Sequence, residues 1–325
     1  MRGLSTASVL LLCLACAGLS SCGSGREPVV LPHSPPRGVL RVWFSTHEQE
    51  EAGNLRAWDF AGLEVSKTGV VTPVPEDPVL AEGLADRRWA ASVHDPVSGR
   101  FLHFLSPPAG TCDVSIHASS SPWTEGELLA KLPCSPRSRL DDAALAGNGA
   151  MLFVRPRNPE APWAPLLRIR LPGGDPETVA EIEGGFHVDR TGRTVCSVRT
   201  SAHGEGRVEL LDLHTGARED LGPARAAAQS ADGAVVAVLE AGVCTALRRG
   251  PENGWTVWRR FEVGPACVSL SLSRSGEYIG FVLNGIRGMY IVERGLAVVD
   301  LETRSLVLQE LDLRALRVWV EEVPD

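Results

Sequence analysis

The sequence is poor in lysine and has no cluster of basic residues. Lysine occurs only at Lys67 and Lys131, and 32 basic residues face 40 acidic ones, for a net charge of −8. Binding to nucleic acid or to an anionic membrane surface relies on concentrated positive charge. The composition therefore argues against both classes of partner.

Helical periodicity and catalytic motifs are also missing. No long stretch repeats apolar residues at helical spacing between two caps. There is no G-x-S-x-G elbow, Walker loop, G-x-G-x-x-G turn or kinase signature. His94, His103 and His117 are expected on successive strands of one repeat, but no H-x-H or H-E-x-x-H pattern marks a metal site. The sequence thus assigns no catalytic residue, no metal ligand and no cofactor.

The N-terminus resembles a bacterial lipoprotein leader. Arg2 precedes a mostly apolar stretch from Ala7 to Gly18, and Leu19-Ser20-Ser21-Cys22 resembles the lipobox. The apolar stretch is too short to cross a hydrocarbon core of about 30 Å as a stable helix. We therefore expect a signal peptide over residues 1–21 and acyl chains such as palmitate on Cys22, which anchor the chain to a lipid bilayer. The alternative is an ordinary secreted protein with a cysteine near its cleavage site.

The next segment, residues 22–38, is rich in glycine, serine and proline and has no periodicity. This composition predicts a tether that is flexible at first and stiffer near Pro35 and Pro36. The folded domain is then residues 39–325, held at the bacterial cell envelope. The outer membrane is favoured, with the domain on its periplasmic or surface face.

Short apolar strands with glycine turns recur along the folded domain at a period near forty-three residues. The turn glycines are Gly99, Gly149, Gly192, Gly233 and Gly276, separated by 50, 43, 41 and 43 residues. Several short strands per unit at such a period are typical of a β-propeller. Glycine suits these turns because a tight hairpin needs a residue that tolerates a positive φ. The fold class predicted is all-β.

Two of these turns resemble the repeat of TolB-type propellers, in which Ser-Pro-Asp-Gly precedes an apolar strand. They are Ser230-Ala231-Asp232-Gly233 and Ser273-Arg274-Ser275-Gly276, and both lack the proline. The motif is short and is shared by other propellers, WD40-like ones included. The resemblance implies a propeller fold and a periplasmic binding or scaffolding role.

The two ends of the domain predict how the ring closes. The first unit begins at GVLRVWFST (38–46), which aligns with a second strand, while LRVWVEEVPD (316–325) is one strand more than a complete sixth unit. We therefore predict six four-stranded blades, with residues 316–323 pairing with residues 39–46 and leaving no open sheet edge there. Seven blades, or two stacked β-domains, are the alternatives.

Paired cysteines predict two disulfides. Cys112 and Cys134 are separated by 22 residues, Cys244 and Cys267 by 23, and the two pairs hold equivalent places three repeats apart. Each pair is expected to bridge within one blade in an oxidising compartment, contributing roughly 3 kcal/mol on the chain-entropy model. Cys196 is left over as a buried, inert thiol.

A set of polar residues falls at or before the innermost strands and is expected at the mouth of a central channel: Arg88, Asp141, Asp142, His187 and Arg225. Two functions follow. The first is a binding or scaffold lipoprotein whose propeller engages a protein or an envelope polymer. The second is an enzyme that acts on a glycan through channel-mouth carboxylates and arginine. We favour binding over catalysis.

Overall fold

The structure is a computed structural model of the chain. It describes residues 31–46, 59–75, 89–105, 113–122, 124, 126–133, 139–157, 163–200, 205–252, 254–263, 267–287, 290–311, 315 and 317–324. The propeller is the unit Pro32–Asp325. The predicted sites Cys22, Arg88, Cys112 and Cys134 lie outside the described residues. Within the described part, no helix is long and apolar enough to cross a membrane.

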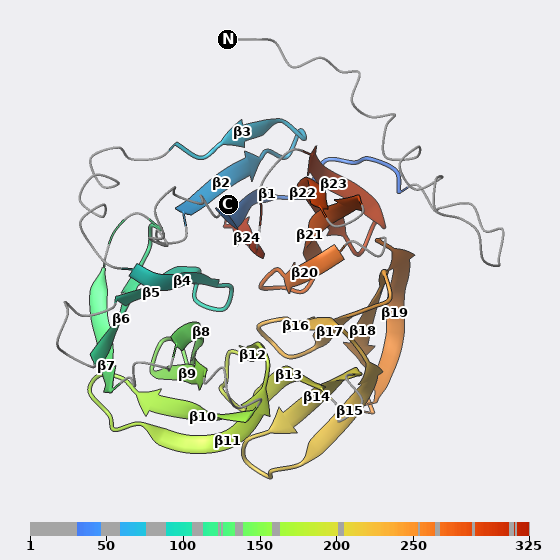
Figure 1. Cartoon of the computed structure of the whole chain (residues 1–325). Helices are drawn as coiled ribbons and strands as arrows, with labels where there is room; N and C mark the ends of the chain where they lie inside the picture. The colour runs from blue at the N-terminus through green and yellow to red at the C-terminus, as the bar shows by residue number, and fades with distance from the viewer. Residues whose placement is uncertain are drawn as a thin grey trace. The chain divides into compact units, whose positions relative to one another are not determined.

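In the described residues, twenty-four strands form six antiparallel sheets of four strands each, arranged as the blades of a ring (Figure 1). The prediction of an all-β, six-bladed propeller is confirmed, and the alternatives of seven blades and of two stacked domains are wrong. The strands of blade 1 are β24 (Arg317–Val323), β1 (Val39–Thr46), β2 (Asp59–Val65) and β3 (Val71–Pro73). Those of blade 2 are β4 (Trp89–Asp95), β5 (Arg100–Leu105), β6 (Asp113–Ser119) and β7 (Glu127–Pro133).

Each remaining blade consists of four strands that are consecutive in the chain. Blade 3 holds β8 (Arg139–Ala146), β9 (Met151–Arg157), β10 (Trp163–Arg170) and β11 (Glu177–Glu183). Blade 4 holds β12 (Phe186–Val188), β13 (Thr194–Thr200), β14 (Gly206–Asp212) and β15 (Arg218–Pro223). Blade 5 holds β16 (Ala226–Gln229), β17 (Val235–Glu240), β18 (Val243–Arg249) and β19 (Trp255–Glu262). Blade 6 holds β20 (Cys267–Leu272), β21 (Tyr278–Arg287), β22 (Tyr290–Asp300) and β23 (Ser305–Leu311).

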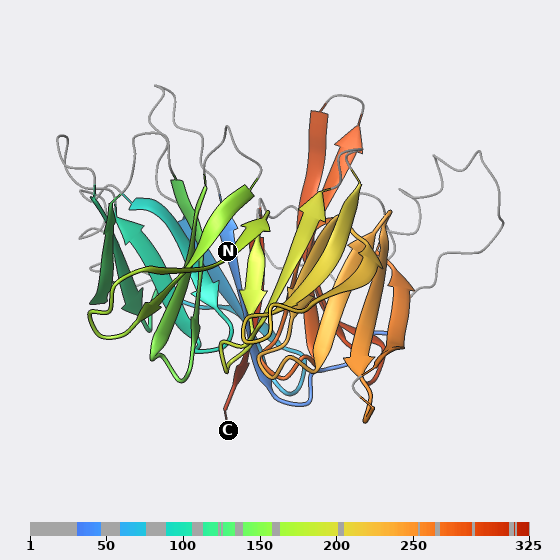
Figure 2. The ribbon, with the colours of Figure 1, turned by 90° about the horizontal axis from the view of Figure 1, so that it is seen from below.

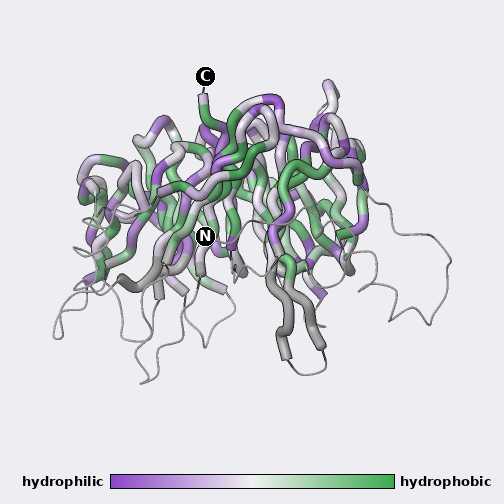
Figure 3. The backbone as a smooth tube through the Cα atoms, turned by 90° about the horizontal axis from the view of Figure 1, so that it is seen from above, coloured by the Kyte–Doolittle hydropathy of each residue, from purple (hydrophilic) through white to green (hydrophobic). Residues whose placement is uncertain are grey.

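The core lies between neighbouring blades, where the apolar faces of two sheets meet. Figure 3 shows hydrophobic stretches along the strands, with hydrophilic positions interspersed. The largest fully buried side chains include Phe101, Phe104, Phe153 and Phe281. Burying such rings is the main favourable contribution to folding, at about 25 cal/mol per Å² of apolar surface. Figure 2 shows the hairpin of β21 and β22 extending beyond its neighbours on one face.

The predicted turn glycines have the predicted conformation. Gly99, Gly149, Gly192, Gly233 and Gly276 all have a positive φ, between 70° and 85°. These turns also join the blades to one another, since the amide of Gly147 donates to the carbonyl of Arg190, that of Arg190 to Ala231, and that of Ala231 to Arg274. The turns that follow the inner strands of blades 3 to 6 are therefore linked by backbone hydrogen bonds.

The ring closes as the sequence predicts. Strand β24 pairs with β1 in antiparallel register, from Val39 opposite Val323 to Ser45 opposite Arg317. The central pair of this register is Val42 opposite Val320, and Trp43 lies opposite Trp319 next to it. Blade 1 thus takes its innermost strand from the C-terminal end of the chain and its other three from the N-terminal end.

Part of the predicted tether is held on blade 6. His33 forms a parallel bridge with Leu306 of the outer strand β23, and the amide of Leu306 donates to the carbonyl of Pro32. Arg37 forms ion pairs with Glu277 at 2.8 Å and with the buried Asp300 at 3.2 Å. Residues 32–37 therefore cover the outer edge of blade 6 at the start of β23, where the amide and carbonyl of Leu306 would otherwise be unpaired.

Candidate functional site

The inner strands of all six blades surround one cavity of about 360 Å³. β4, β8, β12, β16, β20 and β24 each contribute wall residues. Ligand pockets in proteins span roughly 300–1,000 Å³, so the cavity has the size of a site for a small molecule. It includes exposed residues such as Arg225 and Gly185 in its wall, and it therefore reaches the protein surface.

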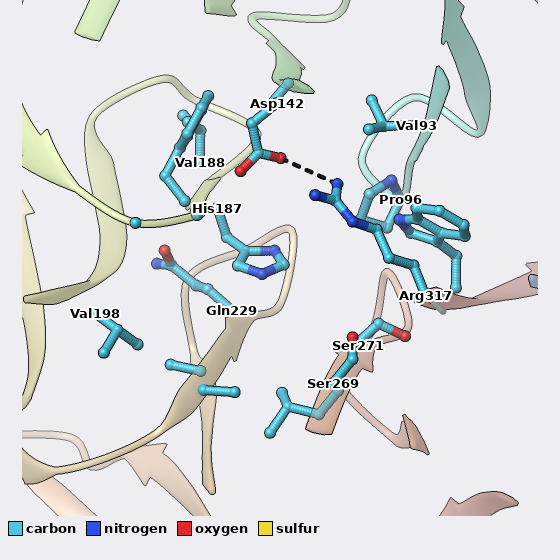
Figure 4. A pocket seen from close by; sticks show the side chains of 18 of the residues that line it. Val93, Pro96, Asp142, His187, Val188, Val198, Gln229, Ser269, Ser271 and Arg317 are labelled. Atoms are coloured by element: carbon cyan, nitrogen blue, oxygen red, sulfur yellow. Dashed lines mark ion pairs between the residues drawn. The ribbon is translucent and has the colours of Figure 1, made fainter. Parts of the chain in front are cut away.

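Three of the predicted channel residues line this cavity: Asp142, His187 and Arg225. Asp141 lies in β8, but its side chain is outside the described part of the structure. Asp142 forms an ion pair with Arg317 of β24, with 3.8 Å between carboxylate oxygen and guanidinium nitrogen (Figure 4). Arg317 belongs to the closing strand, so this charged pair joins a strand from the middle of the chain to the strand at its C-terminal end.

His187 projects between Gln229 and the Asp142–Arg317 pair in Figure 4. Removal from water lowers the pKa of His187 to about 4, and the charge of Arg317 acts in the same direction. At neutral pH the imidazole is therefore uncharged, with one nitrogen that donates and one that accepts a hydrogen bond.

Asp95 also lines the cavity but is held in a turn. Its carboxylate accepts hydrogen bonds from the amide and hydroxyl of Ser98 and from the amide of Leu145 in blade 3. Burial raises the pKa of Asp95 to about 6 in spite of these bonds. Because both oxygens are engaged by the protein, Asp95 joins blades 2 and 3 and is not placed to act on a ligand.

Three buried side chains in the cavity wall carry polar atoms without a hydrogen-bond partner. They are Gln229, 3% exposed, Ser271, 4% exposed, and His94, 2% exposed. Both the amide nitrogen and the amide oxygen of Gln229 lack a partner. The large majority of buried side-chain polar atoms in native proteins have a hydrogen-bond partner. Three exceptions in one cavity wall therefore single out this region.

The sequence reasoning considered His94 only as a metal ligand and did not single out Gln229, Ser271 or Arg317, although a signal for the cavity wall was present for His94 and Gln229. In each of blades 2 to 6, one position near the end of the innermost strand pairs across the following turn with the residue seven positions later in the next strand. In blades 3, 4 and 6 this position is Leu145, Val188 and Leu272, whereas blades 2 and 5 have His94 and Gln229. A polar residue where the other blades have an apolar one marks the wall of the channel.

The cysteine prediction needs a correction. Cys244 lies in β18 of blade 5, but Cys267 begins β20 and so belongs to blade 6. A bridge between them would join two blades and is not within one blade, and the structure has both as buried free thiols. Burial and the neighbouring Cys267 thiol raise the pKa of Cys244. Cys196 is a buried free thiol, as predicted, and burial raises its pKa to about 12.

The three histidines of blade 2 do not form a metal site. His103 and His117 lie opposite each other on β5 and β6, and Nδ1 of His103 is 2.9 Å from the hydroxyl of Ser92. In the described part of the chain, no group of three or more histidine, cysteine or acidic residues is arranged to hold a metal ion.

Comparison with known proteins identifies the fold alone. No protein-family model matches the chain, and no curated protein matches it. Among solved structures the chain is similar to one of a nidogen/laminin complex, with a TM-score of 0.54, 10% identity and coverage of 87% of this chain and 98% of the other. It is also similar to a protein of Bacteroides uniformis assigned as a 6-phosphogluconolactonase, with a TM-score of 0.50, 10% identity and coverage of 87% and 99%.

A protein of Agrobacterium tumefaciens assigned as TolB is a further structural neighbour. The TM-score is 0.49, the identity 11%, and the match covers 89% of this chain and 99% of the other. Matches at 10% identity, such as the two with TM-scores of 0.54 and 0.50, show a shared fold and assign no activity to this chain.

Proposed function

We propose that the protein is an envelope lipoprotein, anchored through Cys22, whose propeller binds a protein or an envelope polymer. The observation that carries the proposal is the closed ring, in which inner strands of all six blades bring polar side chains of different blades to one cavity that reaches the surface. Such a ring is a rigid platform, because each blade packs on two others. Arg225 offers an exposed charge where this cavity opens.

The contact of residues 32–37 with blade 6 shortens the free tether and so limits how far the domain stands from the membrane. Residues 32–37 are held on the propeller, so only residues 23–31 lie between the proposed lipid on Cys22 and the folded unit. A chain of this length spans at most about 30–32 Å when fully extended. The propeller can therefore lie up to this distance from the bilayer, and we expect its partner to be close to the membrane.

The anchor is tested by metabolic labelling with a palmitate analogue. The wild-type chain is expected to carry the label and to fractionate with membranes, whereas Cys22→Ser is expected to lose the label. Cys196→Ser is the matched control, because it removes a buried thiol from the folded domain. Equal labelling of wild type and Cys22→Ser would overturn the anchor.

The partner is tested by photocrosslinking in intact cells. A photoreactive amino acid in place of Arg225 reports on the cavity mouth, and the same amino acid in place of Thr256, exposed on the outer strand β19, is the control. We expect one discrete adduct that depends on position 225. Identical adduct patterns at the two positions, or none at 225, would contradict binding at this mouth.

A further inference from the structure

The polar groups of the cavity wall are mostly uncharged, and its charges balance. Among the described residues that line the cavity, the positively charged ones are Arg225 and Arg317, and the negatively charged ones are Asp95 and Asp142. Two positive and two negative side chains leave no net charge to select an anion or a cation. Which ligand the cavity binds then depends on the hydrogen bonds it offers and on its shape.

The hydrogen-bonding groups offer donors and acceptors together. The amide of Gln229 has both, and neither has a partner within the protein. The hydroxyl of Ser271 likewise donates and accepts, whereas the neutral imidazole of His187 already bonds to the backbone of Ala227 through one ring nitrogen and has the other left as an acceptor. A ligand hydroxyl is the complementary group, because it too donates one hydrogen bond and accepts others.

Apolar side chains complete the wall. Val188, Val198 and Val318 line the cavity beside these polar groups, and Figure 4 shows the first two on the same side as Gln229. The arrangement suits a molecule with hydroxyl groups along its edge and C–H groups on its faces. Both amide atoms of Gln229 are shielded from solvent, so a ligand reaches them when the side chain turns into the cavity. A buried amide is costly to leave unpartnered, and a ligand that bonds to it therefore gains affinity.

We propose that the central cavity is a binding site for a small neutral polyhydroxylated ligand, of the size of a single sugar ring. Gln229 and Ser271 hydrogen-bond to its hydroxyl groups, and Val188 and Val198 contact its carbon skeleton. This proposal uses the same cavity as the partner-binding role proposed above but goes beyond it, since it concerns a small molecule inside the ring and not a macromolecule at its mouth.

The test measures binding of defined probes to the purified full-length chain in detergent micelles, by ligand-detected NMR and by calorimetry. Glucose, galactose and N-acetylglucosamine are the sugar probes, and alanine and succinate represent zwitterions and dianions. At least one sugar is expected to bind in the millimolar range or tighter, and more tightly than either comparator. Binding of no sugar, or tighter binding of alanine or succinate, would overturn the proposal.

Matched variants locate the site. Gln229→Met and Ser271→Ala are expected to weaken sugar binding about tenfold and severalfold, a tenfold change being about 1.4 kcal/mol. Gln309→Met, in the outer strand β23, and Ser45→Ala, which removes another buried unpartnered hydroxyl outside the cavity, are expected to bind like wild type. Thermal unfolding of each variant separates lost binding from lost folding, and Ser271→Ala keeps the test valid if Gln229→Met unfolds. Equal affinity in all four variants would exclude the cavity as the site.

Discussion

Blade 1 and blade 5 have the same four-stranded architecture but are held together in different ways. In blade 5 a turn from Ser230 to Ala234 joins the inner strand to its neighbour, and the inner strand is Ala-Ala-Ala-Gln. In blade 1 no turn joins the inner strand to its neighbour, because β24 and β1 come from the two ends of the chain. The junction there is an antiparallel strand pair, and two tryptophans lie opposite each other on it.

The difference follows from chain entropy. Trp43 and Trp319 lie opposite each other in register, and the Trp43 indole donates to Glu321 at 2.8 Å. Trp319 also stacks on Phe60 with 5.3 Å between ring centroids. Bringing together segments almost a whole chain apart costs more entropy than closing a short turn. Large buried aromatic groups offset this cost in blade 1, whereas small side chains suffice where a tight turn links the strands.

Deleting residues 317–325 is the change with the largest expected effect. It removes the whole of β24 and exposes the edge of β1, together with the apolar surface that Val318 and Val320 cover. The loss is expected to equal or exceed a typical stability of about 5–15 kcal/mol. The truncated chain should aggregate and be degraded in limited proteolysis. Deleting only residues 324–325 leaves β24 intact and should behave like wild type, and a truncated chain as protease-resistant as wild type would contradict the closure.

A single substitution at the same junction is expected to cost less. Trp319→Ala removes a buried aromatic side chain and should lower the free energy of unfolding by about 3–5 kcal/mol. The change for comparison in blade 5 is Trp255→Ala in the outer strand β19, where the half-buried indole donates to Glu219. Urea denaturation should show less than half the loss there. Equal losses would mean that blade 1 does not depend on its aromatic junction.

A structural feature of this protein can be predicted from the sequence when the interaction that determines it lies within a short segment of the chain. The turn glycines and the spare C-terminal strand are visible in the chain itself, because a positive φ and an unpaired strand are properties of short segments. Cys267 was placed in the wrong blade because a residue between two strands gives no sign of which sheet it joins. Arg317 was missed because its role depends on Asp142, which lies far away in the chain.

Acid is expected to weaken blade 1 through a neighbouring histidine. His94 of blade 2 packs edge-on against Phe101 and faces Glu321 of β24 at 3.9 Å, and burial lowers its pKa from 6.5 to about 3. Between these values the unfolded chain binds a proton that the folded chain does not, so stability falls as the pH falls. The loss is about 1.4 kcal/mol per pH unit, or roughly 2 kcal/mol at pH 5.

The variant His94→Leu isolates this contribution. Asp95, whose pKa is raised to about 6, contributes with the opposite sign, because the folded state binds its proton first on acidification. The comparison therefore has to be made between variant and wild type rather than on the wild type alone. Urea denaturation from pH 7 to pH 5 should show a smaller loss of stability for His94→Leu, and parallel pH profiles would contradict the assignment.

The smallest effects are expected at the inner turns of the blades whose four strands are consecutive in the chain. Two glycines there distinguish the cost of backbone strain from the cost of close contact between turns. Gly233 and Gly276 have φ values of 71° and 77°, so alanine at either position costs about 1–2 kcal/mol in backbone strain. At Gly233 a Cβ would lie 3.1 Å from the Gln229 amide nitrogen, which belongs to a side chain that can shift. At Gly276 it would lie 2.9 Å from the Cβ atoms of Ser230 and Val235 in the neighbouring blade, which cannot move without displacing the backbone. Gly276→Ala should therefore lower the urea midpoint more than Gly233→Ala, and the difference measures how tightly the turns of blades 5 and 6 are packed.

Equal shifts of the urea midpoint would mean that backbone strain alone sets the cost of both substitutions. Close contact between the turns of neighbouring blades would then add nothing to stability.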